Sequence, residues 1–268
     1  MKKITKYIPT IILTLLCSCS DYLDIVPDNV TTLDIVFNNR NTAERYLANC
    51  YHFVPDHGSV KRIPGMGAGH ECWFYTTNDS HFDNEVSFYI ARGLQNIDAP
   101  YANYWDGEGG SNLPMFRAIR ECNIFLDYVR DQHKVNDLTD SERKRWIAEV
   151  NVLKAYYHFF LFEHYGPIPI VDKALPVSTD PEGVKVTRMP VDQIVDYMVK
   201  LIDDSYKDLP PVITMEATEM GRLTQPAALA LKAKILLWAA SPLFNGNKDY
   251  ANFRNEEGKT FIKKEFIQ

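Results

Sequence analysis

Positive charge is scarce in this sequence of 268 residues, which has 29 Lys and Arg against 35 Asp and Glu. Three of the lysines fall within residues 1–18, so the rest of the chain has 26 basic and 35 acidic side chains, a formal charge of −9. Nucleic acids and anionic surfaces are bound by clusters of basic residues. The charge balance therefore argues against nucleic acid as a partner.

Cysteine is also rare, with five residues in the whole chain. Cys50, Cys72 and Cys122 stand at unrelated spacings, and with Cys17 and Cys19 they form no C-x-x-C pair. Such spacings predict neither a disulfide framework nor a zinc site. We expect the three internal cysteines to be buried free thiols.

Motifs of catalysis and metal binding are missing as well. The sequence has no G-x-S-x-G nucleophile turn and no H-E-x-x-H zinc motif. Residues 78–85, NDSHFDNE, are rich in oxygen ligands but lack the spacing and the turn glycine of an EF-hand. Residues 106–112, DGEGGSN, include two acids and no Lys or Arg, so they would repel phosphate. The sequence predicts no catalytic residue, no metal and no cofactor, and hence a protein that is not an enzyme.

A long hydrophobic run occurs only near the N-terminus. Lys2, Lys3 and Lys6 precede a mostly apolar run from Ile8 to Leu16. The run is about half of the ~20 residues that span a bilayer. This pattern is typical of a signal peptide and not of a transmembrane helix.

The apolar run ends in LCSC, residues 16–19, which resembles a bacterial lipobox and makes Cys19 the expected lipidated residue. Cys17 fits less well because Leu16 is too bulky next to a cleavage site. An ordinary secretory signal with incidental cysteines is the alternative. The lipobox interpretation assigns residues 1–18 to a lipoprotein signal peptide and residues 19–40 to an acidic tether. Several acyl chains on Cys19 would hold the protein stably on a membrane.

Helical periodicity dominates the rest of the chain. Asn41 is a predicted N-cap, with Glu44 three residues on. A second capping box, Thr139 with Glu142, precedes a continuous apolar stripe that Gly166 terminates. The opposite face of this helix is also apolar between residues 155 and 162, so we expect it to be buried on several sides.

The helical segments fall into two pairs. We predict helices at residues 113–133 and 140–165, and again at 190–209 and 225–241, the last of them rich in alanine. Consecutive helical pairs predict a mainly α fold that is similar to TPR repeats. Such stacks need about three repeats, and two are visible, so we expect the fold to be incomplete at the C-terminus.

An aromatic-rich insert at residues 55–112 interrupts the helical pattern, and we expect it to be one long irregular loop. Sugar binding uses flat aromatic faces together with polar side chains that bond hydroxyl groups. The insert supplies both kinds of side chain, and the candidate glycan-binding residues are Trp73, Tyr75, Asn78, Asp79 and Trp105. The alternative is that these aromatic residues only pack the insert against the helices.

Four blocks of sequence together resemble the SusD/RagB family of outer-membrane nutrient-binding lipoproteins. They are CSDYLDIVP (residues 19–27), FRAIRECNIFLDYV (116–129), AEVNVLKAYYHFFLFEHYGPIPIV (148–171) and GRLTQPAALALKAKILLWAASPLFNG (221–246). The resemblance implies TPR units with long glycan-binding loops, and a SusC-type TonB-dependent transporter as partner. It also implies that residues 41–268 are the N-terminal part of a SusD-like domain, since family members are roughly twice as long.

The leading hypothesis is a glycan-binding lipoprotein, anchored by lipid to the outer membrane and exposed at the cell surface, which passes oligosaccharides to the transporter. A TPR-type lipoprotein scaffold that binds protein or peptide partners is the alternative. A lipoprotein hydrolase and an inactive truncated product are further hypotheses.

Overall fold

The computed structural model describes residues 32–58, 64–69, 86–98, 100–107, 113–175 and 180–262. It separates the chain into two units, residues 1–36 and residues 37–268. The described part of the first unit contains one short helix, α2 (Leu33–Val36). All the other elements belong to the second unit.

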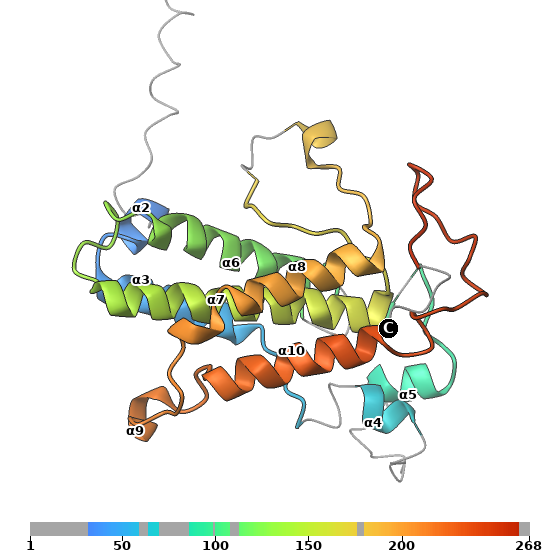
Figure 1. Ribbon diagram of the computed structural model, residues 1–268, viewed down its shortest axis with the longest axis horizontal. Coiled ribbons are helices and arrows are strands. Elements are labelled where there is room, and N and C mark those ends of the chain that lie inside the picture. Colours follow the sequence, from blue (N-terminus) through green and yellow to red (C-terminus); the bar gives the residue numbers. More distant parts are fainter. Residues whose placement is uncertain are drawn as a thin grey trace, which may run out of the picture. The chain divides into compact units, whose positions relative to one another are not determined.

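The second unit is helical, and the long helices lie side by side (Figure 1). Within the described ranges it has no strand, and the one β-bridge pairs Arg254 with Thr260. This confirms the predicted mainly α class. The elements are α3 (Arg40–His52), α4 (Pro64–Ala68), α5 (Val86–Ala91), α6 (Met115–Arg130), α7 (Asp140–Tyr165), η1 (Pro181–Val184), α8 (Val191–Asp203), η2 (Tyr206–Asp208), α9 (Glu216–Glu219) and α10 (Gln225–Ala239).

Helix α7 forms the centre of the unit. It begins at the predicted capping box, in which the Thr139 hydroxyl accepts from the Glu142 backbone, and it ends at Gly166, whose φ of 67° suits glycine. Side chains on all its faces are buried between Ala148 and Phe162. An α-helix without a polar face must be covered on every side. Helices α3, α6 and α8 supply that cover.

The two predicted helical pairs are present. Helix α6 packs against α7, with Ile119, Cys122 and Leu126 fully or almost fully buried. Helix α8 packs against both α7 and α10, with Ile194 and Met198 buried. The arrangement α6–α7 followed by α8–α10 is the TPR-like pairing that the apolar stripes predict. Cys50 and Cys122 are buried free thiols, as expected, while Cys72 lies outside the described residues.

The predicted start of α3 was wrong. Asn39, and not Asn41, is the N-cap, because the Asn39 side chain accepts a hydrogen bond of 3.1 Å from the Thr42 backbone. Glu44 completes no capping box, since its carboxylate instead accepts from Arg40 Nη1 at 2.9 Å. Two asparagines two residues apart are equally good caps by type, so sequence alone could not choose between them.

The prediction of one irregular insert at residues 55–112 also needs correction. Its described parts contain α4 and α5, which pack against each other. Val86 and Phe88 of α5 are buried. Helices of five and six residues are too short for a 3.6-residue period to show in the sequence.

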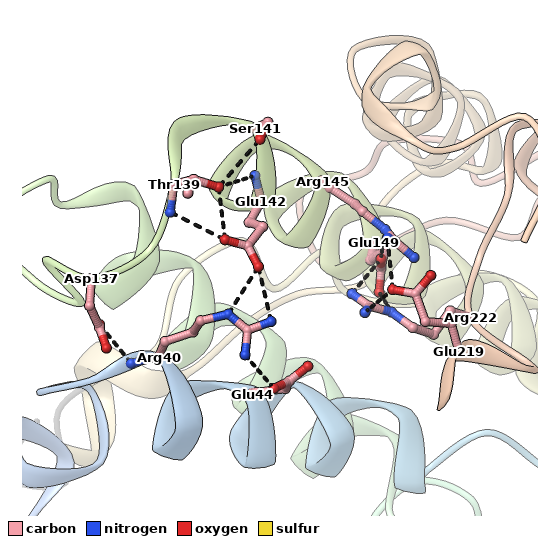
Figure 2. Close-up of polar contacts among 10 residues, drawn as sticks. All are labelled: Arg40, Glu44, Asp137, Thr139, Ser141, Glu142, Arg145, Glu149, Glu219 and Arg222. Carbon is pink, nitrogen blue, oxygen red and sulfur yellow. Dashed lines mark hydrogen bonds and ion pairs between the residues drawn. The ribbon is translucent and has the colours of Figure 1, made fainter. Parts of the chain in front are cut away.

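A buried ion-pair network joins α7 to α3 and α9 (Figure 2). Its centre is Glu149, whose side chain is 0% exposed. Its carboxylate accepts from Arg145 Nε at 2.9 Å, from Arg222 Nη2 at 2.8 Å and from the Tyr51 hydroxyl at 2.8 Å. Glu219 accepts from both arginines, at 2.9 and 3.0 Å. Because every oxygen of Glu149 has partners, the charge is tolerated in the interior.

We expect Glu149→Ala to lower the free energy of unfolding by about 3–5 kcal/mol, because it leaves two partly buried guanidinium groups with one carboxylate. Urea denaturation followed by circular dichroism measures the change. Glu182→Ala is the matched control, since Glu182 is 74% exposed where it pairs with Lys185. That variant should shift stability by less than about 1 kcal/mol. Equal effects of the two substitutions would contradict the structural role of Glu149.

Candidate functional site

The structure describes only part of the predicted site. Cys19, Trp73, Tyr75, Asn78 and Asp79 lie outside the described residues, so their predicted roles stay predictions. Trp105 lies within residues 100–107 and is partly exposed.

Trp105 sits where the insert returns to the helical core. Its ring meets Phe116 of α6 edge to face, with centroids 4.6 Å apart, and Tyr165 of α7 at 5.4 Å. The Arg188 guanidinium lies 5.8 Å from the ring centroid, within the range of a cation–π contact. The protein thus uses part of the Trp105 surface for packing, and the remainder is open to solvent.

The segment beside Trp105 is held in place by hydrogen bonds. The Gln95 side-chain oxygen accepts from the backbones of Tyr101 at 2.9 Å and Ala102 at 3.2 Å. The Tyr165 hydroxyl accepts from the Tyr104 backbone at 2.8 Å, and the Tyr104 ring is fully buried. These contacts fix the backbone before any ligand arrives, which lowers the entropic cost of binding.

A cavity of about 540 Å³ opens between this segment, α4, α5 and the C-terminal end of α7. Volumes of this size are usual for small-molecule sites. Its wall combines small residues with polar and aromatic side chains, and it is lined by Gly65, Ala68, Gly69, Ile90, Gln95, Ala102, Glu163, His164 and Tyr165. Close by in the sequence, Tyr89 and Tyr101 stack with centroids 4.0 Å apart and planes 6° apart.

Sequence reasoning missed the contribution of Glu163, His164 and Tyr165 to this cavity. His158, nearer the middle of α7, is a core residue, since it is fully buried and bonded to the Lys154 carbonyl. His164 also bonds to a backbone carbonyl, that of Phe160 at 2.7 Å, but it is exposed and not part of the core. The available signal was its position in the last turn of α7, just before Gly166.

A second polar cluster covers α7 between α6 and α8. Asn123 of α6 donates to the Val171 carbonyl at 3.1 Å. Lys154 of α7 and Tyr197 of α8 each donate to the Asp172 carboxylate at 2.7 Å. The backbone after Gly166 is therefore tied to all three helices. Burial alone would raise the pKa of Asp172, but the bonds from Lys154 and Tyr197 outweigh it and lower that pKa.

Within the described ranges, no group of three or more His, Cys, Asp and Glu side chains is placed to hold a metal ion. Across those same residues, no helix has the length and apolar composition needed to cross a membrane.

The helical pairs, the loop-bounded cavity and the absence of strands from the described residues define a TPR-like helical protein. Residues 21–237 match the model of a SusD-like family described as starch-binding and associating with the outer membrane. The chain belongs to this SusD-like family. A comparison with curated protein sequences finds no match.

Solved structures share the fold. BT4246 is 27% identical, with a TM-score of 0.68, and the match covers 86% of this chain and 37% of that one. A laminarin-binding SusD-like protein is 18% identical, with a TM-score of 0.59, over 76% of this chain and 41% of that one. Surface glycan-binding protein A from Bacteroides thetaiotaomicron, in complex with laminarihexaose, is 18% identical, with a TM-score of 0.54. That match covers 75% of this chain and 39% of the other. The chain spans less than half the length of each.

His158 makes the stability of this region depend on pH. Its Nδ1–H donates to the Lys154 carbonyl at 2.8 Å and its Nε2 accepts from the Val171 backbone at 3.3 Å, so both nitrogens are used by the neutral ring. Burial lowers the pKa of His158 to about 4, below the value of 6.5 for a free histidine. The unfolded chain therefore binds the proton more tightly. Stability is full above pH ~6.5 and falls as the pH drops towards ~4.

We expect the free energy of unfolding to decrease by about 3 kcal/mol from this group between pH 6.5 and 4. Urea titrations at several pH values measure the slope. His158→Gln should reduce it, whereas His133→Gln, at an exposed position, should leave it unchanged. An unaltered slope in His158→Gln would contradict the assignment.

Proposed function

We propose that this chain is the glycan-capturing part of a surface lipoprotein. Its membership of a family described as starch-binding and associating with the outer membrane carries the proposal. The cavity at the end of α7 supports it, because an aromatic ring, a carboxylate, an imidazole and an amide converge there. Sugar hydroxyls bond to such polar groups, while the flat faces of pyranose rings pack on aromatic side chains.

The proposed function also includes anchoring of the protein to the membrane and transfer of the bound glycan to a transporter. Cys19 carries the lipid, and the residues that follow it, as far as Val36 at the end of the first unit, form the tether to the outer membrane. A SusC-type TonB-dependent transporter receives the captured oligosaccharide and provides the energy for uptake. The chain itself acts by binding and not by catalysis, in keeping with the description of its family.

The alternative function, a TPR-type scaffold for protein or peptide partners, is less well supported. A peptide docking between paired helices needs an open helical surface. Between α6 and α8 that surface is occupied by the chain itself, through Val171 and Asp172. Release of new reducing ends from a glycan would instead favour the hydrolase hypothesis.

Binding is tested by native affinity electrophoresis in gels that contain laminarin or starch. Trp105→Ala and Trp73→Ala should each weaken retention roughly 10-fold, which corresponds to about 1.4 kcal/mol, because each removes an aromatic face. Tyr250→Ala is the matched control, because Tyr250 is an aromatic residue that is 42% exposed and lies outside both the insert and the cavity lining. If no polysaccharide retards the unmodified protein, the proposal fails.

Anchoring is tested by labelling cells with radioactive palmitate. Cys19→Ser should abolish incorporation of label and release the protein from the membrane fraction, because the thiol is the lipid acceptor. Cys17→Ser should remain labelled. If only Cys17→Ser lost the label, Cys17 would be the lipidated residue, and the assigned cleavage site would be wrong.

A further inference from the structure

A second cavity, of about 410 Å³, gathers positive charge in a chain whose net charge is −6. Lys185, Arg188 and Arg254 all line it, and among its described lining residues Glu256 is the one acid. Lys185 pairs with Glu182 at 2.6 Å, which leaves the two arginines as the candidate ligand-binding groups. We call this hollow the basic cavity.

Both arginines of the basic cavity keep most of their hydrogen-bond donors available. Arg254 Nη1 donates to the Gly258 carbonyl at 2.9 Å, and the Arg188 guanidinium lies against the Trp105 ring. Among the residues that the structure describes, neither arginine pairs with a carboxylate. A guanidinium has five N–H donors in a planar fork, so each arginine can still bind an anionic group.

Backbone hydrogen bonds hold the two segments that carry these arginines. Phe261, which is buried and lines the basic cavity, accepts from the backbone of Val191 at 2.9 Å and donates to the Phe253 carbonyl at 3.0 Å. The turn that carries Arg254 is thereby tied to the start of α8, three residues after Arg188. The cavity is therefore formed before a ligand arrives, which lowers the entropic cost of binding.

Trp105 connects the basic cavity with the cavity at the end of α7. Its ring contacts Arg188, which lines the basic cavity, and Tyr165, which lines the other. The carboxylate of the cavity at the end of α7 belongs to Glu163 and is neutralised by Lys234 at 2.8 Å. One aromatic ring thus lies between a site without excess charge and a positive one. A glycan that passes over this ring would meet both.

We propose that the glycan captured by this chain carries an anionic group, a carboxylate or a sulfate, which Arg188 and Arg254 bind while a neighbouring sugar unit occupies the cavity at the end of α7. This inference rests on the proposed function and names its substrate class. Carboxylate and sulfate oxygens accept paired hydrogen bonds from a guanidinium fork. A nucleic acid fits less well, because the net negative charge of the chain repels a long run of phosphates.

Isothermal titration calorimetry of the full chain in mild detergent tests the inference, with laminarin and soluble starch, each compared with its lightly carboxymethylated and lightly sulfated derivatives. At low salt a charged derivative should bind at least ~10-fold more tightly than its uncharged parent, and added salt should reduce this preference. A gain with the carboxymethyl form alone identifies a carboxylate, and a gain with the sulfated form alone identifies a sulfate. Binding without any preference overturns the inference and leaves the proposed function standing, whereas binding of none of these glycans overturns both.

Variants locate the preference. The double variant Arg188→Gln with Arg254→Gln should bring the ratio of charged to uncharged affinities close to one, because an amide carries no charge. Arg45→Gln is the matched control, since it removes an exposed arginine of α3 that does not line the basic cavity, and it should keep the full ratio. The ratio separates recognition of the anion from a loss of folding, which weakens both affinities. Equal ratios in the two proteins overturn the inference, as does polyglutamate that binds as tightly as the charged glycan.

Discussion

The burial of α7 on all its faces is the constraint on which the rest of the structure depends. Its side chains between Ala148 and Phe162, except that of Tyr156, are buried, so α3, α6 and α8 must each cover one side. The polar groups in this stretch are tolerated because each has partners. Glu149 is held by two arginines and a tyrosine, and His158 by two backbone groups. The central helix thereby determines which helices pack against it and where charged side chains can lie in the core.

The same constraint positions the candidate site. The last three residues of α7, Glu163 to Tyr165, line the cavity. Tyr165 also holds the returning insert through the Tyr104 backbone. A rigid helix end thus supplies one wall, and the insert supplies the other. Binding residues placed on loops that a rigid scaffold orients are a common solution in proteins.

The long helices could be predicted from the sequence because their apolar residues recur with the helical period, and α7 shows its capping box and terminating glycine directly. The short helices α4 and α5 could not, since neither spans two full turns. The partners of Glu149 from other parts of the chain were also beyond reach, because Arg222 lies 73 residues away and no local pattern joins the two residues. The aromatic insert could also be recognised in the sequence. Its position next to Glu163, His164 and Tyr165 could not, because these residues are likewise distant from it along the chain.

The most direct test of this account is a crystal structure of the protein grown with laminarihexaose or with a starch oligosaccharide. We expect a sugar ring in the cavity at the end of α7, within bonding distance of Glu163 or His164 and next to the insert that carries Trp105. An oligosaccharide bound elsewhere, for example between α6 and α8, would contradict the assigned site. Well-ordered crystals without bound sugar at saturating concentration would contradict the function itself.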